Sequence, residues 1–413
     1  MSITSPRPLL SITIATRNRI PWAISAIQSI LDITDPRLQL VVHDNSDSHD
    51  LKKYVEENVN DSRFRYGYTN EPLSMSGNFN MAMELASGEY ICSIGDDDGV
   101  NPEILEATAW AKSQDLDSLS IKQTAHYLWP GTRMKSTLFS KVVGGSLRVM
   151  PFQGKIIPIN LEKELKSLMR NGGLYYLEFN LPKVYHGITR RKCMDLYKEK
   201  TGQYFGGTSP DIFSSLAISC VAKKAAVIEY PLTIPGHCVI SEQTHHVENE
   251  QFRPMESAPH FNNLGDYTWC DLVPFVFVGE SFWLDSGILA LRNMGREDLV
   301  KELNLPKLAA HFVGGYRGIS KPVMKTLFYG LEKKNISKVK GFFLFLWGLC
   351  TGPGVSFYRR AWSRIMLITG KKVCHQFVEV NDMRDCTSSL SKHLEQNGHS
   401  FSACASYKNN QNL

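Results

Sequence analysis

Three adjacent carboxylates, Asp96, Asp97 and Asp98, follow a short apolar segment that ends at Gly95. Like charges at this spacing repel one another, and beside a buried strand they need a cation to balance them. Alternate side chains of an extended segment share a face, so we expect Asp96 and Asp98 to point the same way. Two carboxylates with substrate phosphates commonly hold Mg²⁺ or Mn²⁺. The motif therefore predicts a divalent-metal site; the alternative is a solvated acidic turn.

The segments around this motif alternate between strand and helix patterns over the first 130 residues. Short apolar runs predict strands at 9–15, 38–43, 64–69, 90–94 and 118–122. Amphipathic segments predict helices at 21–31, 51–59, 76–85 and 102–114. This alternation predicts an α/β fold with a mostly parallel, doubly wound sheet. A looser α/β pattern continues from residue 183, and from about residue 265 the pattern is helical.

Polar side chains follow several of these strands. Because ligands bind beyond the carboxyl ends of parallel strands, we expect a site at this edge. Arg17 and Arg19 could face a diphosphate, and Asp44 could read a nucleobase or ribose. Asn78, near the start of the helix after the third strand, could hydrogen-bond a ligand. An Asx-turn at Asp44 and a helix-start role for Asn78 are the structural alternatives.

Several enzyme and binding classes lose support from the sequence. It contains no G-x-x-x-x-G-K-[ST], no G-x-G-x-x-G and no G-x-S-x-G, which argues against P-loop proteins, ordinary dinucleotide binders and α/β-hydrolases. Nine cysteines without a C-x-x-C pair favour a reducing compartment over disulfides or structural zinc. A formal charge of +5 over 413 residues is too small to predict nucleic-acid binding.

The matching segments LSITIATRNR, VVHDNSD and NEPLSMSGNFNMAMELASGEYICSIGDDDGVNPE resemble the family 2 glycosyltransferases. The resemblance is close over residues 8–125 and loose over 180–245. It implies a GT-A fold and a metal-dependent transfer from a nucleotide-sugar donor that inverts the anomeric centre. It further implies a glycosyltransferase domain at 1–262, divided into a nucleotide-sugar half (1–125) and an acceptor half (126–262). A helical region at 263–375 and a flexible tail at 376–413 would follow.

The resemblance, together with the residue types and their positions in the chain, predicts roles for individual residues. The residues expected to bind the donor are Thr16, Arg19, Asp44, Asn78, Asp96 and Asp97. Those expected to hold Mn²⁺ or Mg²⁺ are Asp96, Asp98 and His237. Contacts to the acceptor would come from Tyr185, His186 and His245, with core packing as the alternative for Tyr185.

Asp211 is the residue that the resemblance favours as general base. It follows Ser209, the expected N-cap, and Pro210, the expected first helical residue. A role in complementing the helix dipole is the structural alternative, and Glu178 is the competing carboxylate.

Residues 314–372, here called the basic belt, hold 12 Lys and Arg and a single acid, Glu332. Together with its Phe and Trp content this predicts docking on an anionic membrane, a packing face or an oligomer contact. The N-terminus lacks the pattern of a signal peptide. We therefore expect a cytoplasmic enzyme, peripheral at the inner membrane, whose acceptor is a lipid-linked saccharide of surface polysaccharide synthesis. A non-catalytic sugar- or nucleotide-binding protein and a metal-dependent nucleotidyltransferase are the alternatives.

Overall fold

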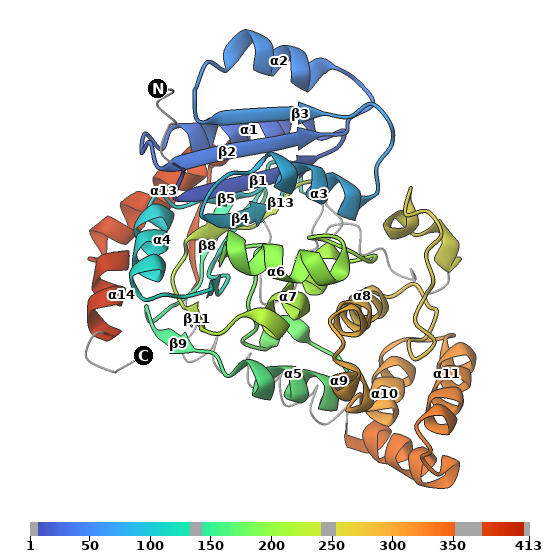
Figure 1. Cartoon of the computed structure of the whole chain (residues 1–413). Helices are drawn as coiled ribbons and strands as arrows, with labels where there is room; N and C mark the ends of the chain where they lie inside the picture. Colours follow the sequence, from blue (N-terminus) through green and yellow to red (C-terminus); the bar gives the residue numbers. More distant parts are fainter. Residues whose placement is uncertain (1–6, 133–142, 241–252, 352–373, 409–413) are drawn as a thin grey trace.

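The computed structural model describes residues 7–132, 143–240, 253–351 and 374–408 of the chain. An eight-stranded sheet with the order β3-β2-β1-β4-β10-β6-β11-β9 forms its centre (Figure 1). Helices pack on both sides of this sheet, and a helical layer extends from one side.

The first half of the sheet is parallel. Its strands, in spatial order, are β3 (Phe64–Tyr68), β2 (Leu38–Asp44), β1 (Leu10–Thr16) and β4 (Tyr90–Ile94). The intervening helices are α1 (Ile20–Leu31), α2 (Asp50–Asn58) and α3 (Met75–Leu85). Nearly every side chain of β1 and β2 is buried, as expected for central strands covered on both faces. The strands and helices predicted from the apolar patterns are confirmed here.

The second half of the sheet mixes the two directions. The antiparallel strand β10 (Gly187–Arg190) lies between β4 and β6 (Ser118–Ile121). Next come β11 (Ala225–Ile228), parallel to β6, and β9 (Ile156–Pro158), antiparallel to β11. The helices of this half are α4 (Ile104–Ser113), α5 (Leu161–Arg170), α6 (Arg191–Thr201) and α7 (Pro210–Val221). The predicted α/β class with a mostly parallel sheet is confirmed.

Two small sheets lie beside the end of β4. One pairs β5 (Gly99–Val100) with β12 (Thr233–Ile234). The other has the order β13-β7-β8-β14, with β13 at Gly236–His237, β7 at Ala125–Leu128, β8 at Ser146–Val149 and β14 at His375–Phe377. Because β5 follows the acidic turn directly and β13 follows β12, these pairings bring residues 236–238 next to residues 96–98.

The helical region begins with two 3₁₀ turns, η4 (Met255–Ser257) and η5 (Pro259–Phe261). It continues with α8 (Gly279–Asn293), α9 (Glu297–Lys301), α10 (Leu305–Gly315) and α11 (Ser320–Lys333), followed by helical residues 338–351. Among the described residues, no helix is both long and apolar enough to cross a membrane.

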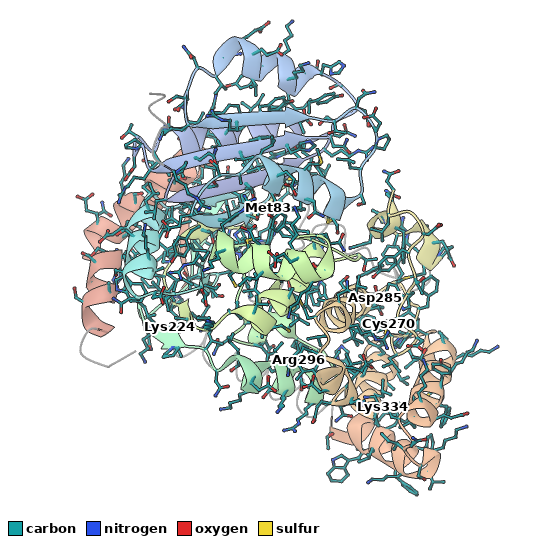
Figure 2. All side chains as sticks on the ribbon, viewed as in Figure 1. Met83, Lys224, Cys270, Asp285, Arg296 and Lys334 are labelled. Atoms are coloured by element: carbon teal, nitrogen blue, oxygen red, sulfur yellow. The ribbon has the colours of Figure 1, made fainter. Side chains whose placement is uncertain are left out.

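This region shares a hydrophobic core with α5, α6 and α7. Gly287 of α8 lies so close to Leu216 of α7 that a Cβ there would be 2.9 Å from the leucine side chain. Figure 2 labels Asp285 and Arg296 in this layer. Asp285 accepts the backbone N–H of Cys270 at 2.8 Å, and Arg296 pairs with Glu162 of α5 at 2.9 Å. The boundary predicted at residue 262 therefore does not separate two cores.

The predicted flexible tail from residue 376 is wrong for the described residues. The chain continues with β14, α13 (Met383–Gln396) and α14 (Phe401–Lys408), drawn in red in Figure 1, and these elements pack against earlier parts of the chain. Met383 is fully buried against Gly99, and its N–H donates to Ser25 Oγ of α1 at 3.0 Å. Phe401 packs edge-on to Trp110 of α4. Burial of the apolar stripe of α13 explains why this polar segment is ordered.

Met383→Ala should lower the free energy of unfolding by about 2–5 kcal/mol, because it empties a fully buried site between α13 and β5. Urea denaturation followed by circular dichroism measures this. Ser388→Ala, at an exposed position of the same helix, is the matched control and should change stability by less than about 0.5 kcal/mol. Equal effects of the two substitutions would show that α13 is not part of the folded core.

Candidate active site

The three predicted carboxylates lie directly after β4, and all three are buried. Thr16, the last residue of β1, and Arg19, the N-cap residue of α1, face them from one side. The end of β4 thus lies beside the end of β1 and the start of α1. This is the carboxyl end of the parallel strands, where the sequence predicted a site.

Arg19 balances two of the three charges. Its Nη1 lies 2.7 Å from Asp96 Oδ1, and its Nη2 lies 2.8 Å from Asp97 Oδ2. Thr16 Oγ1 donates to the other oxygen of Asp96 at 2.6 Å. Burial raises the pKa of Asp96, and Arg19 opposes that rise. Burial and the neighbouring Asp98 raise the pKa of Asp97 to about 7. The guanidinium thus replaces part of the water that these carboxylates have lost.

Asp98 is turned into the protein and accepts hydrogen bonds on both oxygens. Oδ1 accepts the N–H of Gly236 at 2.6 Å, where a Cβ would collide with the Asp97 carbonyl. Oδ2 accepts the N–H of Gly95 at 2.6 Å and lies 3.0 Å from His186 Nε2. Burial acts against the charged form of Asp98, but His186 and these N–H groups outweigh it and lower the pKa. Asp98 therefore ties the acidic turn to residue 236.

Tyr185 and His186 reach this turn because their backbone runs beside β4. His186 N–H donates to the carbonyl of Ser93 at 2.9 Å, and His186 adopts a φ of 51°, which is uncommon outside glycine. The Tyr185 hydroxyl donates to Asp98 Oδ2 at 3.3 Å. Both residues, expected from the sequence at the acceptor side, thus contact the acidic turn.

The predicted metal ligands do not converge as a cluster. Among the described residues, no group of three or more His, Cys, Asp or Glu is arranged to hold a metal ion. His237 Nε2 faces His126 Nδ1 at 3.5 Å, and its Nδ1 is buried with no hydrogen-bond partner in the described part of the chain. Burial lowers the pKa of His237, and the neutral imidazole is the form that binds metals. The carboxylate oxygens and this unpaired nitrogen are suitable ligands for Mg²⁺ or Mn²⁺. In the structure, however, Arg19 and His186 contact the carboxylates in the place of a metal ion.

Asp44 and Asn78 lie next to the turn after β1. Asp44 Oδ1 accepts the N–H of Ser46 at 2.8 Å, which is the Asx-turn alternative, and Oδ2 accepts the Tyr66 hydroxyl at 2.8 Å. Asn78 Nδ2 donates to the carbonyl of Thr16 at 2.9 Å. Asn78 thus holds the end of β1 at Thr16, and Asp44 closes the turn after β2. Their donor-binding role stays a prediction.

Asp211 lies in the first turn of α7 after Ser209 and Pro210, as the sequence predicted. Ser209 Oγ donates to Asp211 Oδ1 at 2.7 Å, and the hydroxyl of Tyr176, from the 3₁₀ turn η1 (Tyr176–Glu178), donates to Oδ2. The Asp211 side chain is half-buried, whereas the competing Glu178 is exposed. Two hydroxyl donors therefore fix the orientation of the Asp211 carboxylate.

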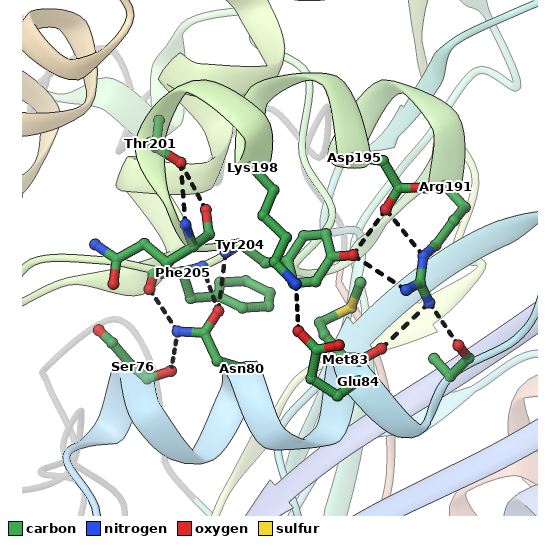
Figure 3. A network of polar contacts seen from close by, with 12 residues as sticks. Ser76, Asn80, Met83, Glu84, Arg191, Asp195, Lys198, Thr201, Tyr204 and Phe205 are labelled. Atoms are coloured by element: carbon green, nitrogen blue, oxygen red, sulfur yellow. Dashed lines mark hydrogen bonds and ion pairs between the residues drawn. The ribbon is translucent and has the colours of Figure 1, made fainter.

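The loop before Asp211 is held from two sides. Figure 3 shows the α3 side, where Asn80 Oδ1 accepts the N–H groups of Tyr204 and Phe205 at 2.9 and 3.0 Å. Ser76 Oγ of α3 donates to the carbonyl of Gly207 at 2.8 Å. From the opposite side, Ser286 Oγ of α8 accepts the N–H of Ser209 at 2.8 Å. α3 and α8 thus both position the segment that carries Asp211.

Tyr185 connects the two acidic groups electrostatically. Burial raises the pKa of Tyr185, and the carboxylates of Asp98, Asp97 and Asp211 raise it further. All three carboxylates therefore act against ionisation of the Tyr185 phenol. His245, the remaining predicted acceptor residue, lies outside the described residues.

The sequence did not indicate Tyr176, Ser286 or the backbone N–H of Gly236. Tyr176 lies in an irregular segment, and Ser286 lies in a helix that shows no polar motif. Arg19 was noted as a diphosphate ligand but not as the partner of two carboxylates. A lone arginine shortly after a strand carries no signal of such pairing, because the partners are 77 and 78 residues away.

Arg19→Ala should destabilise the protein by about 3–5 kcal/mol at neutral pH, because it leaves buried Asp96 and Asp97 without a counter-charge. The free energy of unfolding in urea measures this. Arg17→Ala is the matched control, since Arg17 forms an exposed pair with Asp47 that is worth about 0–1 kcal/mol. A small effect at both positions would rule out Arg19 as the cation that stabilises the acidic turn.

Comparisons with known proteins give matches to part of the chain. The chain is 34% identical over 109 residues to WcaA of Escherichia coli K12, named as a colanic acid biosynthesis glycosyl transferase, covering 26% of this chain and 39% of that protein. It is 33% identical over 93 residues to the GalNAc(5)-diNAcBac-PP-undecaprenol beta-1,3-glucosyltransferase of Campylobacter jejuni, covering 22% of this chain and 30% of that protein. The match thus spans well under half the length of either relative.

Among solved structures, S. aureus TarS 1–349 in complex with UDP-GlcNAc aligns with a TM-score of 0.44 and 13% identity, over 84% of this chain and 91% of that chain. Residues 11–158 match the family model described as glycosyl transferase family 2. That range contains the parallel half of the sheet and the acidic turn. The chain therefore carries a family 2 glycosyltransferase domain.

Proposed function

We propose that this chain is an inverting glycosyltransferase that moves a sugar from a nucleotide-sugar donor to a saccharide acceptor. The observation that carries the proposal is the placement of Asp211. Two hydroxyls orient this carboxylate at the start of α7, and Ser76 of α3 holds the segment before it. A direct displacement requires an oriented base and a donor-binding edge, and this chain offers Asp211 for the first and the acidic turn at the end of β4 for the second.

In the proposed reaction, an acceptor hydroxyl attacks the anomeric carbon while Asp211 takes its proton. The new bond to the acceptor oxygen forms as the bond to the diphosphate oxygen breaks, and the nucleoside diphosphate leaves with the electron pair. Ser209 and Tyr176 hydrogen-bond to one oxygen each. Because an ionised carboxylate has about four lone-pair sites, room remains for the proton.

At the donor side, we propose that Thr16, Asp44, Asn78 and Asp97 line the nucleotide-sugar site with Asp96. Arg19 supplies positive charge where the diphosphate would leave. We propose that Asp96, Asp98 and His237 would hold Mg²⁺ or Mn²⁺ in place of the pairs that Asp96 and Asp98 now form with Arg19 and His186, and that this ion would stabilise the charge on the departing diphosphate.

At the acceptor side, we propose that Tyr185 and His186 contact a saccharide, with His245 from the segment outside the described residues. The name of the Campylobacter jejuni relative contains an undecaprenol-linked acceptor. This supports a lipid-linked acceptor for the present chain as well. Such an acceptor would place the enzyme at the cytoplasmic face of the inner membrane, in surface polysaccharide synthesis.

Asp211→Asn should lower the rate of sugar transfer by about 10²–10⁴-fold, because the amide cannot accept the proton of the acceptor hydroxyl. Donor affinity, measured by calorimetry, should stay unchanged. Glu178→Gln is the matched control, since Glu178 is exposed nearby, and it should retain the full rate. Unchanged transfer by Asp211→Asn would eliminate Asp211 as the base. Donor binding without any sugar transfer by the unaltered chain would point to a non-catalytic binding protein.

A thermal-shift screen against UDP-, GDP-, CDP- and dTDP-sugars should reveal one stabilising donor. A ligand present at 100 times its dissociation constant stabilises the native state by about 2.7 kcal/mol. We expect Mn²⁺ or Mg²⁺ to increase the shift and EDTA to reduce it. Asp96→Asn should abolish the shift, whereas Asp50→Asn, on exposed α2, should preserve it. No shift with any donor would refute the proposed substrate. Release of pyrophosphate from a nucleoside triphosphate would indicate a nucleotidyltransferase instead.

A further inference from the structure

One helical segment exposes far more apolar surface than the other described helices. Residues 338–351 carry Val339, Phe343 and Trp347, whose residues are 67%, 66% and 70% exposed. Because these positions are four residues apart, they form one line along the helix, here called the 339–347 stripe. Phe342, Leu344 and Leu346 beside it are also exposed. A contiguous apolar patch of this kind marks an interaction surface.

The opposite side of the same helix is already packed. Phe345 is buried, and a Cβ at Gly341 would lie 2.3 Å from the side chain of Leu331 in α11. A Cβ at Gly348 would likewise lie 2.7 Å from Ala310 of α10. The two glycines therefore let the helix approach its neighbours closely. The 339–347 stripe therefore lies on a different side of this helix from the side that packs against α10 and α11.

Several positive charges lie on the helix that carries the stripe and on the preceding segment of the chain. Lys338 and Lys340 lie on the same helix, and exposed Arg317, Lys321 and Lys325 lie on or just before α11. The single acid of the region, Glu332, pairs with Lys338 at 2.8 Å. Two other lysines are occupied within the chain, since Lys333 pairs with Asp271 and Lys334 donates to carbonyls at the end of α9. The described part of the basic belt, in which the stripe lies, therefore carries a strong excess of positive charge.

We propose that the 339–347 stripe docks on an anionic phospholipid bilayer, with its apolar side chains at the level of the acyl chains and its lysines at the headgroups. Helices with exposed Phe and Trp flanked by Lys bind such interfaces through both contributions. A second copy of the chain fits less well. A symmetric dimer places the same patch against itself, so Lys340 and its neighbours would meet like charges.

The test uses the full chain and sucrose-loaded vesicles, and it does not depend on sugar transfer. We expect cosedimentation with vesicles of phosphatidylcholine and phosphatidylglycerol, and weak binding to phosphatidylcholine alone. Phe343→Ser with Trp347→Ser should lower vesicle affinity by about tenfold or more, because the apolar contribution is lost. Lys338→Glu with Lys340→Glu should do the same and remove the dependence on anionic lipid. All four side chains are exposed, so the fold should be retained.

Two substitutions of the same chemistry serve as matched controls. Leu196→Ser removes an exposed apolar side chain on α6, and Lys53→Glu reverses an exposed charge on α2. Both should bind vesicles like the unaltered chain. The proposal is overturned if anionic vesicles do not bind the chain, or if the stripe variants bind as tightly as the controls. It is also overturned if the unaltered chain is a dimer that Phe343→Ser with Trp347→Ser converts to a monomer.

Discussion

The burial of three consecutive carboxylates after β4 is the constraint around which the candidate site is organised. Each acid loses hydration at this position, and its neighbours repel it, so the turn is stable only with compensating groups. Arg19 supplies them for Asp96 and Asp97, and backbone N–H groups and His186 supply them for Asp98. The acidic turn therefore contacts three other parts of the chain: the turn after β1, the segment before β10 and the strand β13. The site geometry follows from this electrostatic requirement.

Elements late in the sequence support both ends of the site. α13 packs on α1 through Met383 and Ser25 and so stabilises the position of the helix whose N-cap is Arg19. α8 supports the other end, because Ser286 accepts the N–H of Ser209 two residues before Asp211. Both supporting helices lie beyond residue 262, where the sequence predicted that the glycosyltransferase domain would end. The helical region from α8 to α11 itself shares a hydrophobic core with α5, α6 and α7.

Much of the fold could be predicted, because central parallel strands read as continuous apolar runs and the helices between them are amphipathic. The acidic turn and the placement of Asp211 after Ser209 and Pro210 were also visible locally. The inward rotation of Asp98 was not, since it depends on Gly236, 138 residues away. The ordered C-terminal segment was missed, although its signal was present. Met383, Cys386, Leu390 and Leu394 recur at helical spacing and are all buried, but the polar composition around them hid this stripe.

The two sides of the helical layer have different roles. Its inner side positions the Ser209–Asp211 segment through Ser286, and its outer helix presents the 339–347 stripe. Because both belong to one packed core, a bilayer bound at the stripe would be held at a fixed orientation to Asp211. A lipid-linked acceptor diffuses in two dimensions and presents its sugar at a limited height above the headgroups. Fixing the base relative to the membrane would therefore restrict which hydroxyl reaches it, so attachment would contribute to acceptor selection as well as to local concentration.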